Sequence, residues 1–313
     1  MPTTLRRHAV AALLAATLAL GTAACSSASS SSSSGTTTTT PPGPTSGADL
    51  SKVTKVATVA AELPAATLQK GTLTVALDAT YAPDEFVASD GKTVIGMDAD
   101  LATAIGKVLG LRVTLTNATF DTIIPALGSG RFDMGASSLT DTLAREAQVD
   151  FVQYFQAGEG FYVKSGSSLT LDGLGSLCGH SVAVETGTTE ETDAQTQAKT
   201  CTTAGKTTVK VLSYQSQNDA NLAVSSGRAD VGFLDSQVAG YVVAQSNGQF
   251  ATVGQAFSVA PYGLALPKGG GLATPVLDAL KSLMADGTYT AILQHWGVQA
   301  GAITTPHING AAS

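Results

Sequence analysis

A seven-residue pattern that occurs twice constrains the fold of this chain more than any other feature. Residues 129–135 read SGRFDMG and residues 226–232 read SGRADVG. In each copy a helical pattern precedes the glycine and an apolar run follows it, which is typical of a helix that turns into a strand. The recurrence predicts either two halves with the same local plan or chance reuse of a common helix-glycine-strand turn.

Apolar periodicity around the first copy predicts strands and helices in alternation. Residues 73–77 place apolar side chains at every second position, as in a strand. The predicted elements that follow are a helix over 101–109, a strand over 111–116, a helix over 121–127 and a strand over 132–136. This alternation predicts a parallel α/β architecture, in which ligands bind beyond the strand ends. Residues 50–69 are weakly helical until Pro64 interrupts them, so the main fold should begin near Gly71.

The first 24 residues have the features of an export signal. Arg6 and Arg7 precede an apolar run of about a dozen residues, too short to cross a bilayer core of roughly 30 Å. Small residues then lead to Cys25, as in the bacterial lipobox, although Thr22 stands where that motif usually has Leu. We expect removal of residues 1–24 by the general secretion route and lipidation of Cys25. The paired arginines would also suit twin-arginine export, but their surroundings do not complete that motif.

Composition separates a tether from a folded part. Residues 25–50 are mostly Ser, Thr, Gly and Pro after the cysteine, which predicts a flexible tether. The hydrophobic content of 43% is sufficient for the cores of two lobes. Charged residues make up 13% and the net charge is −7, so the chain offers no basic surface to nucleic acid.

Cys178 and Cys201 are the two cysteines beyond the export signal. In an oxidising compartment such a pair is typical of a disulfide. Metal binding is the alternative, with His180 as a neighbouring ligand, but no further ligand cluster accompanies it.

Hydroxyl groups and an arginine follow the first copy of the pattern. Residues 137–141 read SSLTD, and Arg145 comes about one helical turn later. Hydroxyls, backbone amides and a guanidinium together suit a carboxylate. Alternatively, Thr140 or Asp141 caps a short helix and Arg145 pairs with Glu146 or another surface acid.

Two further candidate positions lie at strand-to-helix turns in the second half. Thr188 and Glu191 fit a capping box, and the helix start would also present free amides to an anion. Asp235 directly follows an apolar strand, where it could bind an ammonium group or serve as a helix N-cap. With Arg145 on one lobe, this arrangement would form a clamp for an amino acid.

Several ordered stretches resemble family 3 extracellular solute-binding proteins, the polar amino-acid receptors of ABC importers. The resemblance covers about residues 71–297. Its motifs are VALDATYAP at 75–83, GMDADL at 96–101, FDTIIPAL at 120–127, TDTLAR at 140–145, GTT at 187–189 and DGTY at 286–289. Each motif alone is weakly specific, whereas their common order and spacing are specific.

This resemblance implies a two-lobed periplasmic-binding-protein-like fold of type II. It places a first α/β lobe over residues 51–160 plus 258–304, a second over 161–257 and a tail over 305–313. The ligand would bind in the cleft between the lobes. Two hinge crossings are expected near residues 156–161 and 257–262.

The resemblance also implies a ligand site of nine residues. Arg145 and the amides near Thr140 and Thr189 would hold the ligand carboxylate. Asp235, the Thr140 hydroxyl and the Ser138 backbone would hold its ammonium group.

The other four residues of the implied site lie around the ligand side chain. Tyr81 and Phe120 would flank it, and Asp78 and Glu185 would favour a cationic or amide-bearing group, although Asp78 could equally anchor its loop. Asp84 departs from the family, because many relatives have Phe there, and this puts the usual apolar wall in doubt.

The expected function is capture of a free polar amino acid, with no cofactor or metal, for an ABC permease. The protein would be a monomer held to the outer face of the bacterial cytoplasmic membrane by its lipid anchor. A sensor of the same fold is one alternative, and a small-carboxylate dehydratase with Glu185 as acid or base is another. No phosphate loop, nucleophile elbow or metal motif supports an enzyme.

Overall fold

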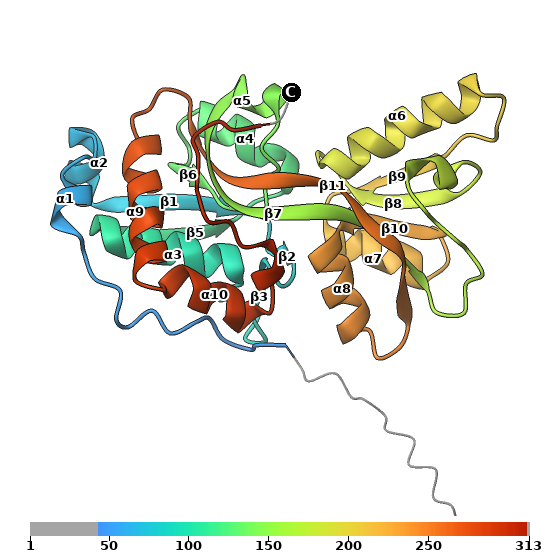
Figure 1. Cartoon of the computed structure of the whole chain (residues 1–313), viewed down its shortest axis with the longest axis horizontal. Coiled ribbons are helices and arrows are strands. Elements are labelled where there is room, and N and C mark those ends of the chain that lie inside the picture. Colours follow the sequence, from blue (N-terminus) through green and yellow to red (C-terminus); the bar gives the residue numbers. More distant parts are fainter. Residues whose placement is uncertain (1–42, 312–313) are drawn as a thin grey trace, which may run out of the picture. The chain divides into compact units, whose positions relative to one another are not determined.

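The computed structural model describes residues 43–311 (Figure 1). The expected export signal and the lipidation of Cys25 lie outside these residues. None of the helices in the described part is both long enough and apolar enough to span a bilayer.

One sheet of eight strands runs through the fold, in the order β5-β1-β6-β11-β7-β10-β8-β9. Each end of the sheet is a group of parallel strands, as the alternation predicted. At one end these are β1 (Thr72–Leu77), β5 (Arg112–Asn117) and β6 (Met134–Gly135), and at the other β8 (Ser181–Glu185), β9 (Lys210–Tyr214) and β10 (Val231–Asp235). A small antiparallel sheet holds β2 (Thr80–Tyr81), β3 (Glu85–Val87) and β4 (Val94–Ile95). The strands are therefore parallel within each end group, but not across the whole sheet.

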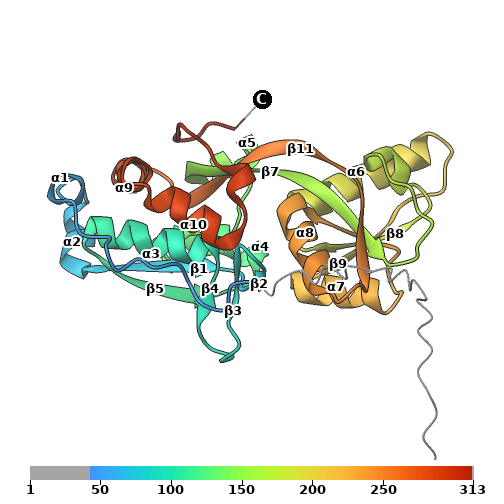
Figure 2. The same ribbon diagram turned by 60° about the horizontal axis from the view of Figure 1, so that its bottom comes forward.

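Two long antiparallel strands join the two parallel groups (Figures 1 and 2). They are β7 (Val149–Lys164) and β11 (Phe250–Pro267). Their pairing shifts register at three places, between Val253 and Phe257, between Phe257 and Ala260, and between Tyr262 and Gly263. Both expected hinge crossings fall within these two strands.

Helices cover both groups of strands, and their bounds largely follow the predicted periodicity. They are α1 (Ala57–Ala60), α2 (Ala65–Lys70), α3 (Met97–Leu109), α4 (Phe120–Gly128), α5 (Leu143–Glu146), α6 (Thr189–Thr203), α7 (Gln217–Ser225), α8 (Ser236–Gln245), α9 (Ala273–Ala285) and α10 (Thr288–Trp296), with 3-10 turns at Leu174–Leu177 and Gln299–Gly301. α3 ends at Gly110, whose left-handed φ of 70° suits glycine. Pro64 interrupts the helical stretch as predicted, because it lies between α1 and α2 and is the N-cap residue of α2.

Separate apolar cores form around the two groups of strands. The largest core takes its residues from positions 50–157 and 262–298. Two others take theirs from positions 161–257, apart from Tyr81, which packs against them from outside that range. We refer to residues 51–160 plus 258–304 as the first lobe and to residues 161–257 as the second lobe; these boundaries remain a proposal.

The repeated pattern has the same structure in both lobes. Gly130 and Gly227 each have a φ of 73° where the helix ends. The aspartate of each copy then fixes a neighbouring strand. Asp133 accepts bonds from the backbone N and the hydroxyl of Thr74, both at 2.6 Å, and Asp230 accepts bonds from the N and hydroxyl of Ser181 at 2.8 and 2.6 Å. Matching contacts favour a shared local plan over chance reuse of a turn.

The last residues of the expected tether, Ala48 and Leu50, contact the fold. The backbone N of Ala48 donates to Asp100 Oδ2 at 2.7 Å, and Leu50 is part of the first core. Asp100 also accepts from Trp296 Nε1 at 2.7 Å, so this buried carboxylate has two hydrogen-bond donors. The expected tail also packs, since Gln153 N donates to His307 O at 2.9 Å.

Cys178 and Cys201 form a disulfide, with their Cα atoms 5.7 Å apart. The predicted pairing is confirmed, and the alternative of a metal site at these cysteines is wrong. The bond ties the loop before β8 to α6, at the end of the second lobe.

Candidate ligand-binding site

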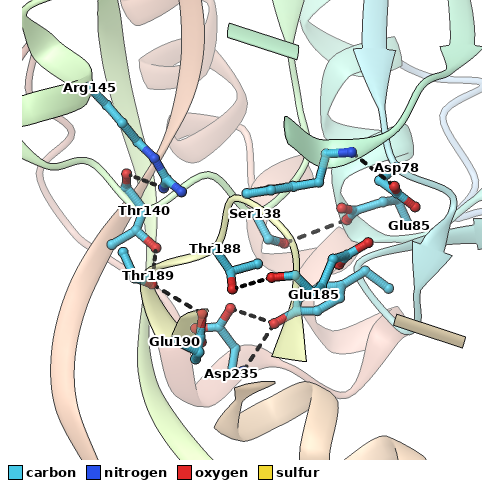
Figure 3. A pocket seen from close by; sticks show the side chains of 12 residues that line it. Asp78, Glu85, Ser138, Thr140, Arg145, Glu185, Thr188, Thr189, Glu190 and Asp235 are labelled. Atoms are coloured by element: carbon cyan, nitrogen blue, oxygen red, sulfur yellow. Dashed lines mark hydrogen bonds between the residues drawn. The ribbon is translucent and has the colours of Figure 1, made fainter. Parts of the chain in front are cut away.

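All nine residues expected at the ligand site line one pocket, whose empty space, with open solvent included, is about 280 Å³. The twelve lining residues are Asp78, Tyr81, Glu85, Phe120, Ser138, Thr140, Arg145, Glu185, Thr188, Thr189, Glu190 and Asp235 (Figure 3). The structure thus brings together residues that lie far apart in the sequence.

Strand ends position the side chains of this pocket. Asp78 directly follows β1, and Glu185 and Asp235 are the last residues of β8 and β10. Ser138 follows β6 with a left-handed φ of 47°, which turns the chain toward the pocket wall. Carboxyl ends of parallel strands are the usual ligand edge of an open α/β sheet.

Direct hydrogen bonds join the two lobes across the pocket. The Tyr81 hydroxyl donates to Asp235 Oδ2 at 2.8 Å and accepts from the backbone N of Asp235 at 3.0 Å. Thr140 and Thr189 bring their hydroxyl oxygens to 3.4 Å. The structure therefore represents a closed arrangement of the lobes.

Arg145 points into the pocket and does not pair with a surface acid as the alternative prediction had it. Its Nη1 donates to the carbonyl of Thr140 at 2.8 Å and its Nη2 to the carbonyl of Gly187 at 2.9 Å. Its guanidinium lies 5.5 Å from the ring centre of Phe120. The predicted cap residues are also wrong, because Thr142 caps α5 by accepting from the backbone N of Arg145.

The start of α6 serves as a helix cap and as a pocket wall at once. Thr188 Oγ1 accepts from Glu191 N at 3.1 Å, and Glu191 Oε2 accepts from Gly187 N at 2.7 Å. The predicted capping pair is confirmed. Thr188 and Thr189 also line the pocket, so the two interpretations do not exclude each other.

Asp235 occupies the N-cap position of α8, but its side chain makes no capping bond. The carboxylate is committed to Tyr81 instead. Burial raises its pKa to about 6, against the opposing effects of hydrogen bonds and the charge of Arg145. An ammonium group bound here would place a positive charge next to the Asp235 carboxylate and stabilise its ionised form.

Asp78 anchors its loop and faces the pocket. Its Oδ1 accepts from Thr80 Oγ1 at 2.7 Å and its Oδ2 from the backbone N of Phe120 at 3.0 Å. Glu185 is 2% exposed, and its Oε1 has no hydrogen-bond partner among residues 43–311. Burial, followed by the charge of Asp78, raises the pKa of Glu185 to about 9.

Sequence reasoning did not assign Glu85 and Glu190 to the pocket. Glu190 is 2% exposed, with Oε2 accepting from Thr189 Oγ1 at 3.2 Å and Oε1 left without a partner in the described part of the chain. Glu85 accepts from the Ser137 hydroxyl at 2.8 Å. No local pattern marks Glu85, and a glutamate in the first turn of a helix, such as Glu190, normally indicates an exposed partner of the helix dipole.

Asp84 lies behind the pocket and not in its wall. It is fully buried, and its Oδ2 accepts from Ser138 Oγ at 3.0 Å and from Gln237 Nε2 at 2.9 Å. Gln237 also donates to the Tyr262 hydroxyl at 2.7 Å. Asp84, which stands where the resemblance led us to expect Phe, thus forms a polar link to Gln237 of the second lobe.

Five carboxyl side chains and a single guanidinium line the pocket. This imbalance favours a ligand that carries more positive than negative groups. Within residues 43–311, no group of three or more His, Cys, Asp or Glu side chains is arranged to hold a metal ion.

Comparison with known proteins gives consistent matches. Residues 73–299 match the profile of the bacterial extracellular solute-binding proteins, family 3. The arginine-binding protein ArgT of Corynebacterium glutamicum is 32% identical over 252 residues, which are 80% of this chain and 82% of that protein.

Solved structures of similar proteins share the fold. An ancestral arginine-binding protein has been solved with arginine and also with glutamine, and in both structures it is 39% identical to this chain with a TM-score of 0.66. The arginine-bound structure matches 72% of this chain and the glutamine-bound structure 73%, and each match covers 98% of the solved chain. The ancestral amino acid-binding protein AncCDT-1, a precursor of cyclohexadienyl dehydratase, is 34% identical with a TM-score of 0.66 and covers 74% of this chain and 97% of its own. The expected fold is confirmed, and the chain belongs to family 3 of the bacterial extracellular solute-binding proteins.

Proposed function

We propose that this protein captures a free basic amino acid, with arginine as the first candidate, outside the cytoplasm for an ABC importer. The observation that carries this proposal is the acidic lining of the closed pocket, where one guanidinium faces five carboxyl groups. Burial raises the pKa of each of these carboxyl groups, so a bound cation would stabilise their ionised forms. A basic amino acid has two positive groups and one negative group, and it would offset this imbalance. Similarity to the arginine-binding protein of Corynebacterium and to the ancestral protein solved with arginine supports the same ligand.

The geometry suggests an orientation for the ligand. Its carboxylate would bind Arg145 and the neighbouring hydroxyls of Thr140 and Thr189, and its ammonium group would bind Asp235. Its side chain would pass between Tyr81 and Phe120 toward Asp78 and Glu185, which lie opposite Arg145 in Figure 3. Because these groups come from both lobes, the ligand favours the closed state and shifts the equilibrium toward it.

Glutamine is the second candidate ligand. The ancestral arginine-binding protein has also been solved with glutamine, and an amide can bind a carboxyl group through its hydrogen-bond donors. Both candidates share the ammonium and carboxylate groups that Asp235 and Arg145 would bind.

The cellular setting belongs to the same proposal. Residues 1–24 would be removed on export, lipidated Cys25 would anchor the chain, and the residues after it would form a tether that ends before Ala48. A permease would then recognise the closed monomer. Binding without chemical turnover is proposed over a dehydratase activity, although AncCDT-1 is a precursor of such an enzyme. Mass spectrometry of a bound amino acid after prolonged incubation would reveal any turnover.

Calorimetric titration with arginine, lysine, glutamine and glutamate tests the proposed function. Arg145→Ala should weaken arginine binding by roughly 30-fold to several thousand-fold, because losing one partner of a buried charge pair costs about 2 to 5 kcal/mol. Arg131→Ala is the matched control, since this exposed arginine lies over Phe132 and outside the pocket. Equal arginine affinity in the two variants, or a preference for glutamate, would refute the proposal.

A further inference from the structure

Carboxyl groups from opposite lobes meet at one end of the pocket. Figure 3 shows Asp78, Glu85 and Glu185 on the side opposite Arg145. Asp78 and Glu185 are 3% and 2% exposed. They lie close enough for the charge of Asp78 to act on Glu185. Repulsion between two neighbouring buried carboxylates favours the protonation of one of them unless a cation binds between them.

Hydrogen bonds identify which of the two carries the proton. Both oxygens of Asp78 accept from donors, at 2.7 Å from Thr80 and at 3.0 Å from the Phe120 amide, which stabilises the ionised form. Glu185 Oε1 is buried and has no partner within the described chain. A carboxylate oxygen left without a donor is costly, whereas a carboxylic acid needs fewer donors and can itself donate to Asp78.

The surrounding charges also favour the protonated form of Glu185. Besides burial and Asp78, the exposed carboxylate of Asp121 on α4 raises the pKa of Glu185, which reaches about 9. Glu85 on β3 adds a further buried carboxyl group beside Asp78. On α7, the backbone amide of Gln217 acts in the opposite sense and favours the ionised form. The lining cation, Arg145, lies on the opposite side of the pocket.

We propose that Glu185 selects between ligand classes by its protonation. When ionised, it joins Asp78 in binding a cationic side chain, and its proton passes to the solvent. When protonated, it donates a hydrogen bond to the carbonyl oxygen of an amide side chain, while Asp78 accepts from the amide NH₂. This inference rests on the proposed function and deepens it, because it makes the preference for arginine over glutamine depend on pH.

The expected pH dependence of this preference follows from the number of protons that each complex binds. The arginine complex binds one proton fewer than the glutamine complex at every pH between the Glu185 pKa values of the two complexes. The ratio of the association constants, arginine to glutamine, therefore rises by up to tenfold for each pH unit in that range. Protonation of the free protein cancels from this ratio, so the open or closed state of the free protein does not affect it.

The experiment measures Kd for L-arginine and L-glutamine from pH 5.5 to 8 in the full exported protein and in two variants. In the unchanged protein the ratio should rise at least tenfold across this range. Glu185→Gln keeps the shape of the side chain but cannot ionise, so its ratio should stay constant. Asp121→Asn removes a nearby charge but leaves Asp78 and Glu185 in place, so its arginine-to-glutamine ratio should rise with pH as in the unchanged protein. Titrations in two buffers of different ionisation enthalpy should show about one proton more taken up with glutamine.

A constant ratio in the unchanged protein, or a slope that persists in Glu185→Gln, would overturn the inference. So would the absence of glutamine binding at pH 5.5. In each of these cases arginine binding itself would still support the proposed function, whereas failure to bind arginine at any pH would refute that function instead.

Discussion

The hydroxyl of Tyr81 offers a direct test of how the closed state is held. In Tyr81→Phe the ring that flanks the pocket remains, but the two bonds to the backbone N and the Oδ2 of Asp235 are lost. In the closed, arginine-bound state the backbone N of Asp235 would lack a partner and its carboxylate would lose one donor, at a cost of about 1 to 3 kcal/mol, whereas water serves both groups in the open state. Arginine affinity should therefore fall by about 5-fold to 150-fold, which calorimetry would measure, with most of the loss in a faster dissociation rate.

Tyr289→Phe is the matched control for this prediction. The Tyr289 hydroxyl also makes two buried bonds, donating to Tyr154 O at 2.8 Å and accepting from Ile303 N at 2.9 Å, but both lie within the first lobe. Its loss should lower the free energy of unfolding and leave the arginine Kd unchanged. The reasoning is refuted if Tyr81→Phe binds arginine as tightly as the unchanged protein, or if both variants lose affinity equally.

Two further predictions concern stability. Replacing Cys178 and Cys201 by serine should lower the free energy of unfolding by about 3 kcal/mol, because the disulfide spans a separation of 23 residues. The arginine Kd should not change. Urea unfolding would measure the stability and calorimetry the Kd. Burial raises the pKa of Asp98 to about 6, so the folded protein binds a proton that the unfolded chain, with a pKa near 3.9, has lost. This contribution to stability is present below pH 4 and declines as the pH rises toward 6, by roughly 1.4 kcal/mol for each pH unit between the two pKa values. Asp98→Asn should therefore reduce the difference between urea midpoints at pH 4.5 and 7, and an unchanged difference would contradict it.

Local periodicity was sufficient to predict the elements that place the site. Asp78 and Asp235 each come at the end of an apolar strand, and parallel strands bring such ends to one edge of a sheet. The sequence alone could not decide whether Thr188 caps a helix or lines a pocket. The structure shows that one residue does both, because its hydroxyl bonds the helix backbone while it also lines the pocket.

Long-range contacts account for what the sequence could not reveal. The predicted tether runs to residue 50, but Asp100 is buried and accepts a hydrogen bond from the backbone N of Ala48, which lies 52 positions earlier. Glu190 stands in a helix start where glutamate is normally exposed, and only the packing of the two lobes turns it inward. The antiparallel crossing of β7 and β11 also depends on partners more than 80 positions apart, such as Phe161 and Val253.

The pairing of β7 with β11 makes the second lobe an insertion whose two ends are neighbours. Phe161 pairs with Val253, and Glu159 pairs with Phe257, so the chain leaves the first lobe and returns to it at the same place. The cores at positions 161–257 need only Tyr81 from elsewhere. A fragment beginning near residue 159 and ending near residue 257 would thus have adjacent termini, and a short loop could replace it in the first lobe. Each half of the clamp could then be produced and its folding measured by itself.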